Sequence, residues 1–428
     1  MAPSRTSRRT TEVFTLRRCA LALTAALAAT VLLTACGQDK TEPTITTAAK
    51  ITLPPLSGRY PVGTTDLHLV DSRQDPWHPA DKRELMVTVS YPAKRAGDRA
   101  AWMSPGMAAA IDRMATADPE QGLTPGTIDW GGTKRLASNS VEVDRTGGAW
   151  PVVLFSHGFG VVRELNSVRT DDLASHGYVV VSIAHTYDAQ TVEFPGGRMV
   201  TSDAKPDPAF LATSMDTRVA DTRFVLDQLD RLQRGEHPDA ENRTLPAGLA
   251  GALDLTKVGM FGHSLGGYTA GEAMYHDRRI GAGINFDGSM SVGKLGEVTQ
   301  HGVDRPFMLV GADGVNPQTG RKFEHSHVDD FDPSWGQFWA NQPGWKRDLH
   351  FDGAAHMSFT DLQVAVPQCA GLLTPKLREQ GVGTIHPARS VDAQQDYIAA
   401  FFDLHLKQIG TDLFDGNSPR HPDTRFIP

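Results

Sequence analysis

A serine at an abrupt strand-to-helix turn limits the folds that are open to this chain. The apolar run 258–261 is followed by Gly-His-Ser-Leu-Gly at 262–266, with Ser264 in the centre, and then by small residues that can begin a helix. Glycine on each side of the serine lets a strand and a helix approach where a Cβ atom would collide. The pattern predicts that Ser264 is a nucleophile at a sheet edge. A glycine-rich helix entry with an incidental serine is the alternative interpretation.

Strands alternate with helices around this turn. Continuous apolar runs, typical of strands covered on both faces, occur at 151–155, 178–183, 257–261, 280–286 and 306–310, with a short last one at 348–351. Two-sided segments at 215–232 and 393–406 predict helices. The alternation predicts an α/β fold, with a mostly parallel central sheet and helices on both faces. Such sheets place their chemistry at the carboxyl ends of the strands.

Residues 57–428 are predicted to form one catalytic domain with an insertion before the first central strand. Two half-buried strands are expected at 64–70 and 84–91, where polar and apolar residues alternate. Residues 100–148 contain Trp and Met among prolines and glycines and fit no regular layer, apart from a short helix near 107–114. This segment is a candidate cap over the site. An ordinary excursion over the core edge remains the alternative, and residues 410–428 are expected to be a surface tail.

The N-terminus predicts export. Five arginines and one glutamate precede an uncharged run from Cys19 to Ala35, and the run ends Leu-Thr-Ala-Cys at Cys36, which resembles the lipobox of bacterial lipoproteins. We therefore expect a signal peptide over residues 1–35, lipidation of Cys36 and a polar tether over residues 36–56. A plain secretory signal or an uncleaved anchor are the alternatives. The Arg8-Arg9 pair leaves the export route open.

Charge and cysteine content exclude several classes of function. The formal net charge is −8 and no basic cluster lies in the body of the chain, which argues against nucleic acid as a partner. Of the three cysteines only Cys369 would remain free after export, so no intrachain disulfide is expected. No C-x-x-C or H-E-x-x-H pattern occurs, and we expect neither a metal site nor a cofactor.

A serine nucleophile needs a base, and His356 is the predicted one. It follows Gly-Ala-Ala directly after the last sheet strand, in a loop that can swing back over the turn, and it follows Ser264 in the chain order typical of this fold class. His325 and His327 lie in a polar, acidic loop and are expected to be solvated. His157 and His263 flank the site but precede the serine, so we interpret both as packing or hydrogen-bonding residues.

The orienting acid has two candidates, because both Asp287 and Asp313 end strands that follow the serine. Strands lie ~4.8 Å apart, so both carboxylates come within one or two strand spacings of Ser264, and the pattern does not choose between them. The oxyanion needs two backbone N–H groups. One is the amide of Leu265, and the other is expected within 156–160.

Four segments resemble the platelet-activating-factor acetylhydrolases and their bacterial lipase-like relatives. They are the segments 154–160, 172–180, 262–267 and 356–361, within a similarity that extends from about 63 to 406. The resemblance implies an α/β-hydrolase fold, assigns the acid to Asp287 over Asp313, and places the second oxyanion amide on Phe159. It also implies a short acyl substrate, such as the acetyl group at the sn-2 position of an ether phospholipid.

These observations predict an exported, lipid-anchored serine esterase that acts on an ester or phospholipid and contacts the membrane through its N-terminal lipid. A broad lipase or esterase, or a cutinase-like polyester hydrolase, is the alternative. We expect residues 100–148 and the tryptophan-rich stretch 335–345 to shape the acyl and leaving-group pockets. A rival from another class is a lipid-anchored solute-binding protein, for which the export signal would serve equally well.

Overall fold

The computed structural model of the chain describes residues 48–117, 123–202, 207–316 and 319–428. The predicted signal peptide, Cys36 and most of the expected tether lie outside these residues. Among the residues described, no helix is both long and apolar enough to cross a membrane.

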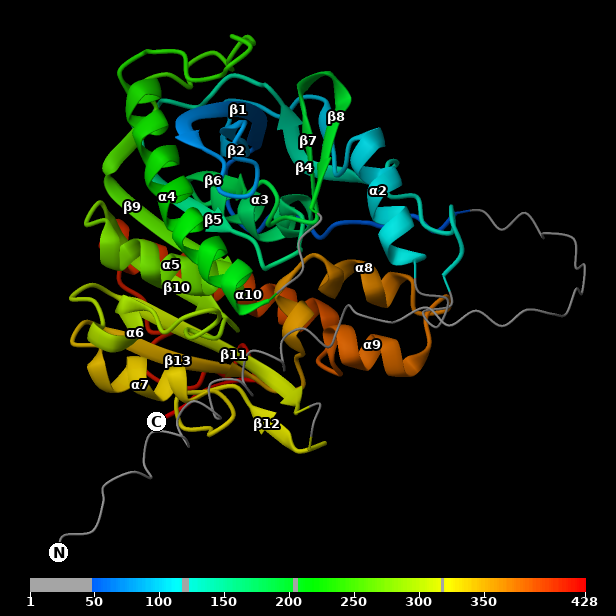
Figure 1. Cartoon of the computed structure of the whole chain (residues 1–428), viewed down its shortest axis with the longest axis vertical. Helices are drawn as coiled ribbons and strands as arrows, with labels where there is room; N and C mark the ends of the chain where they lie inside the picture. Colours follow the sequence, from blue (N-terminus) through cyan, green and yellow to red (C-terminus); the bar gives the residue numbers. More distant parts are fainter. Residues whose placement is uncertain (1–47, 118–122, 203–206, 317–318) are drawn as a thin grey trace, which may run out of the picture.

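Within the described residues, twelve strands form one sheet in the order β14-β13-β11-β10-β9-β5-β6-β2-β1-β4-β3, with β12 paired to β11 (Figure 1). A second, small sheet pairs β7 with β8. The strands are β1 (Val62–Gln74), β2 (Lys82–Pro92), β3 (Arg99–Ala101), β4 (Lys134–Asn139), β5 (Trp150–Ser156), β6 (Val179–Ala184), β7 (Thr191–Phe194), β8 (Arg198–Thr201), β9 (Leu253–His263), β10 (Ile280–Phe286), β11 (Phe307–Val315), β12 (Lys322–Glu324), β13 (Lys346–Phe351) and β14 (Thr424–Phe426).

The helices cover both faces of the sheet. They are α2 (Pro105–Ala115), α3 (Ser167–Ser175), α4 (Pro208–Gln233), α5 (Leu265–His276), α6 (Glu297–His301), α7 (Pro333–Asn341), α8 (Leu362–Gln368), α9 (Pro375–Val382) and α10 (Pro387–Leu406), with short 3₁₀ turns η2 (Arg163–Asn166), η3 (Pro195–Gly197) and η4 (His356–Phe359). The central strands β6, β5, β9, β10, β11 and β13 are all parallel to one another. This confirms the predicted α/β architecture with a mostly parallel sheet.

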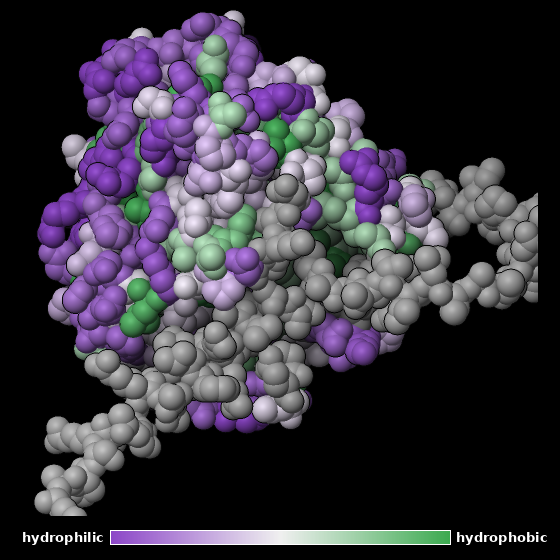
Figure 2. All heavy atoms as spheres, viewed as in Figure 1, coloured by the Kyte–Doolittle hydropathy of each residue, from purple (hydrophilic) through white to green (hydrophobic). Residues whose placement is uncertain are grey.

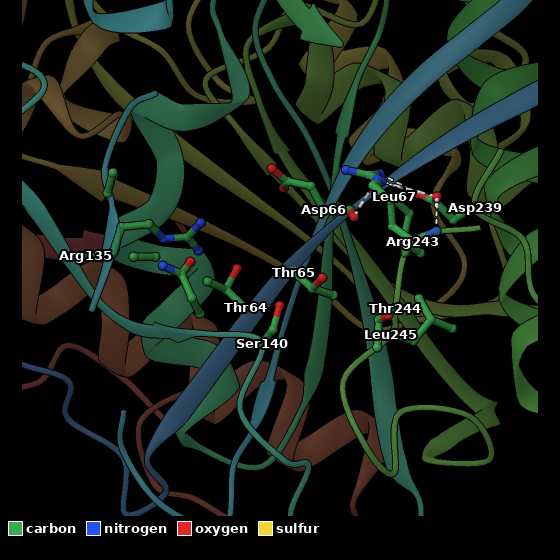
Figure 3. Close-up of a pocket in the computed structure, with 13 residues that line it drawn as sticks. Thr64, Thr65, Asp66, Leu67, Arg135, Ser140, Asp239, Arg243, Thr244 and Leu245 are labelled. Carbon is green, nitrogen blue, oxygen red and sulfur yellow. Dashed lines mark hydrogen bonds and ion pairs between the residues drawn. The ribbon is translucent and has the colours of Figure 1, made fainter. Parts of the chain in front are cut away.

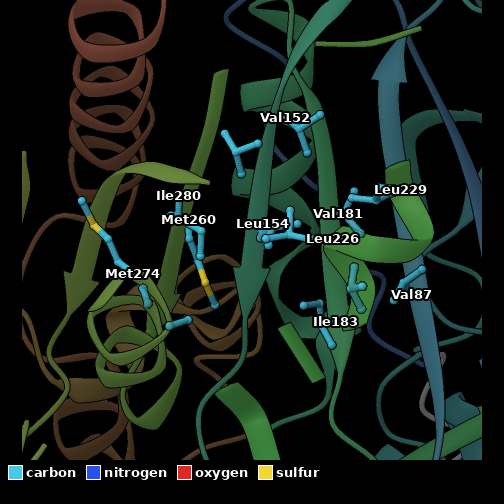
Figure 4. Close-up of a cluster of buried hydrophobic side chains, with 14 of the residues drawn as sticks. Val87, Val152, Leu154, Val181, Ile183, Leu226, Leu229, Met260, Met274 and Ile280 are labelled. Carbon is cyan, nitrogen blue, oxygen red and sulfur yellow. The ribbon is translucent and has the colours of Figure 1, made fainter. Parts of the chain in front are cut away.

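The core divides into two layers because successive side chains of a strand point to opposite faces. In β5, Val152 and Leu154 join the layer under α4 and α5, whereas Val153 and Phe155 join the layer under α3 and α10. Figure 4 shows the first layer, where the labelled side chains of β5, β6 and β9 lie together with Leu226 and Leu229. Covering on both faces explains why these strands are continuously apolar.

Two segments contribute more to the sheet than the sequence predicts. Residues 100–148 were expected to fit no layer, but β4 pairs in parallel with β1, and β3 pairs with β4. Residues 410–428 were expected to be a surface tail, but β14 pairs antiparallel with β13, and Phe414 and Ile427 are buried. These strands are only three to six residues long. Strands this short carry no readable periodicity of their own, and pairing to the sheet determines them.

The remaining part of the 100–148 segment packs beside the site. The expected short helix is present as α2, and its Met107 and Ile111 share an apolar cluster with Trp102, Trp130 and residues of α8. Figure 1 shows α2, α8 and α9 on the side toward which the arrow of β11 points, which is the carboxyl edge of the sheet. The face in Figure 2 is mostly hydrophilic over α4, α6 and α7, with apolar side chains in smaller patches toward the middle.

Candidate active site

The predicted turn around Ser264 is present between β9 and α5. Ser264 has φ 57° and ψ −126°, a backbone conformation that non-glycine residues rarely adopt. A Cβ atom on Gly262 would lie 2.2 Å from the carbonyl oxygen of Gly266, and one on Gly266 would lie 1.9 Å from that of Ser156. Both positions therefore require glycine, because the strand, the helix and the neighbouring strand β5 meet here at backbone distance.

The structure brings His356 to Asp287. The Nδ1 atom of His356 donates to the Oδ2 atom of Asp287 at 2.5 Å. The carboxyl end of β10, where Asp287 lies, is joined to the turn because the amide of Ser264 donates to Phe286 O at 2.7 Å. The side chain of His356 is 40% exposed while that of Asp287 is 8% exposed, so the imidazole faces outward from a buried carboxylate. This is the arrangement expected of a base and its orienting acid.

Asp313, the alternative acid, has other partners. Its carboxylate accepts from Nε2 of His350 at 2.9 Å and from the amide of Gly353 at 2.8 Å. The side chain of Asp313 is 45% exposed. Its partial burial would raise its pKa, but the hydrogen bonds from His350 and Gly353 outweigh this effect, so the pKa of Asp313 is lowered. The structure therefore pairs Asp287, and not Asp313, with His356.

His263 ties the backbone of the candidate base to the nucleophile turn. Its ring lies 4.6 Å from the ring of His356, and its Nε2 atom donates to His356 O at 2.9 Å. Burial and the neighbouring His356 hold the pKa of His263 well below its usual range, so this imidazole is neutral. Because His263 directly precedes Ser264, the contact fixes the loop of His356 against the turn. His263 is a hydrogen-bonding residue, as predicted.

The two predicted oxyanion amides belong to two segments that meet at Ser264, the start of α5 and the loop after β5. Leu265 is the first residue of α5, where backbone N–H groups have no partner inside the helix. In the loop after β5, a Cβ atom on Gly158 would lie 3.2 Å from Cβ of Ser264, so this loop runs directly against the serine. Among the described residues no hydrogen bond is assigned to the amide of Phe159, although the next two amides both donate to backbone carbonyls. Both amides remain candidates for the oxyanion hole.

A buried ion-pair network lies beneath this loop. Arg218 of α4 donates to His157 O at 2.6 Å and to Oγ of Ser156 at 3.0 Å, and it pairs with the carboxylate of Asp188. All four side chains are buried. The amide of Gly160 donates to Asp188 O at 3.1 Å. The network therefore holds both ends of the segment 156–160, which is a role that the sequence did not reveal.

His325 binds the other oxygen of Asp287, which contradicts the expectation that it is solvated. Its Nδ1 lies 2.8 Å from Oδ1 of Asp287, its Nε2 lies 3.2 Å from Oδ2 of Asp332, and its ring stacks on Trp335 at 3.9 Å. His327 is also enclosed, since it stacks on Trp339 and bonds to Asp348. Trp335, in the stretch expected to shape the substrate pockets, is fully buried and stacks on His325.

These contacts set the charges of the site. Burial alone would raise the pKa of Asp287, but the positive charge of His325 and the hydrogen bonds from His325 and His356 hold it well below its usual range. Burial would lower the pKa of His325, but the carboxylates of Asp287 and Asp332 raise it to about 10. At neutral pH Asp287 is therefore an anion beside a protonated His325.

A polar cavity of about 310 Å³ lies elsewhere in the fold. Figure 3 shows its lining, in which Thr64 and Asp66 of β1 face Arg135 and Arg243. In the sheet, β1 lies four positions from β9, so this cavity is lateral to Ser264. The two arginines are already paired with Asp171 and Asp239 respectively, and we assign no substrate to it.

Comparison with known proteins agrees with this architecture. A family model described as "Platelet-activating factor acetylhydrolase, isoform II" matches residues 45–194 and 199–420. A solved structure, a ferulic acid esterase from Streptomyces cinnamoneus, is 33% identical and superposes with a TM-score of 0.69, covering 88% of this chain and 99% of that one. The fold and the strand–serine–helix turn define an α/β-hydrolase. More narrowly, the chain belongs to the platelet-activating factor acetylhydrolase isoform II family, which confirms the resemblance seen in the sequence.

Curated relatives have lower identity. A probable 1-alkyl-2-acetylglycerophosphocholine esterase from Arthroderma benhamiae is 28% identical over 293 residues, which are 65% of this chain and 66% of that protein. The platelet-activating factor acetylhydrolase of Cavia porcellus is 27% identical over 183 residues, which are 40% of this chain and 41% of that protein. The chain thus matches less than two thirds of the length of either relative.

Proposed function

We propose that this chain is a carboxylic ester hydrolase with Ser264, His356 and Asp287 as its catalytic triad. The observation that carries the proposal is the 2.5 Å contact between His356 and Asp287, beside a serine held in a strained turn. Such strain is stored at functional sites, where the surrounding structure holds the residue in place. Family membership supports the same chemistry.

The proposed mechanism needs only groups of the chain and water. The hydroxyl oxygen of Ser264 attacks the ester carbonyl carbon while Nε2 of His356 takes the hydroxyl proton. Asp287 accepts from Nδ1 and stabilises the imidazolium, and the amides of Phe159 and Leu265 donate to the oxyanion. The intermediate collapses, and the leaving alkoxide takes the proton from His356. Water then attacks the acyl-serine with His356 as base, which releases the acid and restores the serine.

Short acyl esters are the proposed substrates, with the acetyl group at the sn-2 position of an ether phospholipid as the leading example. The family description and the name of the Arthroderma relative support this choice.

A second candidate, an ester of an aromatic acid, is favoured by a row of half-buried rings that begins at the oxyanion loop. The ring centroids of Phe159 and Phe210 lie 5.8 Å apart, and those of Phe210 and Trp77 lie 5.1 Å apart in a stacked arrangement. Tyr187 contacts Trp77 and stacks on His78. The solved relative is named a ferulic acid esterase.

A panel of esters separates these substrates. We expect kcat/KM for p-nitrophenyl acetate to exceed that for the octanoate by at least about tenfold, because one unaccommodated methylene changes transition-state binding by about 1–3 kcal/mol. A phospholipid with an sn-2 acetyl group should be cleaved, and methyl ferulate should be the poorer substrate. Faster hydrolysis of the octanoate would favour a broad lipase or a polyester hydrolase, and faster hydrolysis of methyl ferulate would favour the aromatic candidate.

We further propose that the enzyme is exported and anchored to the outer face of the membrane through a lipid on Cys36. The arginine-rich start, the uncharged run and the lipobox-like end of residues 1–35 support this proposal. Intact-mass analysis of the mature native protein should give a chain that begins at Cys36 and carries a diacylglyceryl group. A mature protein with an unmodified Cys36 would contradict the anchor and leave the esterase proposal untouched.

A further inference from the structure

The carboxylate of Asp287 is shared between two histidines, of which catalysis by a triad uses one. Oδ2 accepts from His356, and Oδ1 accepts from Nδ1 of His325 and from the amide of Ala312 at 3.1 Å. The second histidine in turn reaches Asp332 through its Nε2 atom. The four side chains form a continuous chain that runs from a buried carboxylate to the exposed imidazole of the candidate base.

The surroundings of His325 fix its ring in one orientation. One face stacks on Trp335 at an interplanar angle of 27°, and the indole N–H of Trp335 donates to Gly288 O at 2.8 Å, directly after Asp287. Asp332 is held in turn, because its Oδ1 accepts from the amide and the hydroxyl of Ser334. A histidine with a carboxylate on each ring nitrogen donates from both, which is the property of an imidazolium.

We propose that His325 is a positioning residue for ester hydrolysis, whose imidazolium holds Asp287 ionised and turned toward His356. This inference rests on the function proposed above, because it assigns a role within the same triad. Without this cation, Asp287 would be a buried carboxylate whose remaining partners are His356 and the amide of Ala312. With it, the negative charge that stabilises the transition-state imidazolium is already formed and oriented.

The charge of His325 also affects the basicity of His356. The charged or titratable groups that face His325 are Asp287, after β10, and Asp332, before α7. Those that face His356 are Asp287 and the neutral His263, and the charge of Arg169 on α3 acts on His263. If the cation at 325 is removed, no neighbouring positive charge offsets the carboxylate of Asp287, so the carboxylate favours the protonated form of His356 more strongly. Because the base must be unprotonated, a variant without the cation should lose activity at a higher pH than wild type as the solution is acidified.

The test compares His325→Gln with His327→Gln. His327 is a matched control, since it stacks on Trp339 at 3.9 Å and bonds to a buried carboxylate, Asp348, that does not contact His356. In His325→Gln the acid limb of the kcat/KM–pH profile should move up by about one pH unit, as expected for one charge acting across a carboxylate at an effective dielectric constant of ~20–40. Plateau kcat should fall about tenfold or more, as the carboxylate loses its orientation. In His327→Gln the acid limb of the kcat/KM–pH profile should stay at the same pH as in wild type.

A measurement on the unsubstituted protein keeps the inference testable if His325→Gln fails to fold. In 15N-histidine spectra, the ring of His325, identified by its through-space contacts with Trp335, should still show the resonances of an imidazolium at pH 8. A neutral ring there, or an acid limb in His325→Gln equal to that of wild type, would overturn the inference. If instead the wild-type protein shows no hydrolysis that depends on Ser264, the proposed function itself is wrong.

Discussion

Replacing Ser264 with alanine lowers kcat for ester hydrolysis by about 10⁶-fold, because loss of the nucleophile in a triad costs nearly as much as loss of the whole triad. The remaining rate would come from the oxyanion amides and substrate binding alone. Ser264→Ala should fold normally, since the alanine keeps the backbone of the turn and deletes one oxygen atom. The measurement is steady-state hydrolysis of p-nitrophenyl acetate, with a circular dichroism melt on the same sample.

A nearby serine provides the control for this variant. Ser291 lies in the loop after β10, where its hydroxyl contacts that of Ser289 at 3.3 Å. Ser291→Ala deletes a half-buried hydroxyl that no step of the proposed mechanism uses, so it should keep kcat within about fivefold of wild type. Residual activity above about 1% in Ser264→Ala would exclude this serine as the nucleophile, because a triad without its nucleophile cannot sustain that rate.

Replacing Asp287 with asparagine lowers kcat by about 10⁴-fold, because an amide cannot hold the histidine in the tautomer that accepts a proton at Nε2. The substitution also leaves the imidazolium of His325 with Asp332 as its one carboxylate, so the variant should unfold at a lower urea concentration than wild type. Kinetics and urea denaturation on the same preparation measure both effects.

Asp313→Asn is the matched comparison, since Asp313 lies near the carboxyl end of the neighbouring strand β11 and also pairs with a histidine, His350. It should keep kcat within a few-fold of wild type. If Asp313→Asn abolished turnover while Asp287→Asn did not, the assignment of the acid would be reversed.

The sequence predicts the central architecture well because buried parallel strands are readable one at a time. Residues 280–286 were predicted as a strand and form β10 with the same bounds, and the expected turn at Ser264 follows β9. Strand spacing alone could not decide whether Asp287 or Asp313 is the orienting acid. It depends on the path of the loop from Gly353 to His356, which places Gly353 on Asp313 and His356 on Asp287.

The supporting residues of the site were missed because their signals are tertiary. His325 lies among polar and acidic residues, a composition typical of a solvated loop, and only the fold brings Asp287, Asp332 and Trp335 around it. Arg218 similarly appears as a charged residue of a two-sided helix. It is fully buried because Ser156, the last residue of β5, offers it a hydroxyl, the following His157 offers it a carbonyl, and Asp188 pairs with its charge. Charged residues are rarely buried without such partners.

The proposed function depends most on one step, in which the hydroxyl of Ser264 becomes a nucleophile through His356. Reaction with a fluorophosphonate, followed by intact-mass and peptide analysis, tests it directly. We expect one adduct per chain, located on Ser264, absent in Ser264→Ala and formed far more slowly in His356→Ala. No adduct, as expected of a solute-binding protein, or an adduct on another residue, would contradict it.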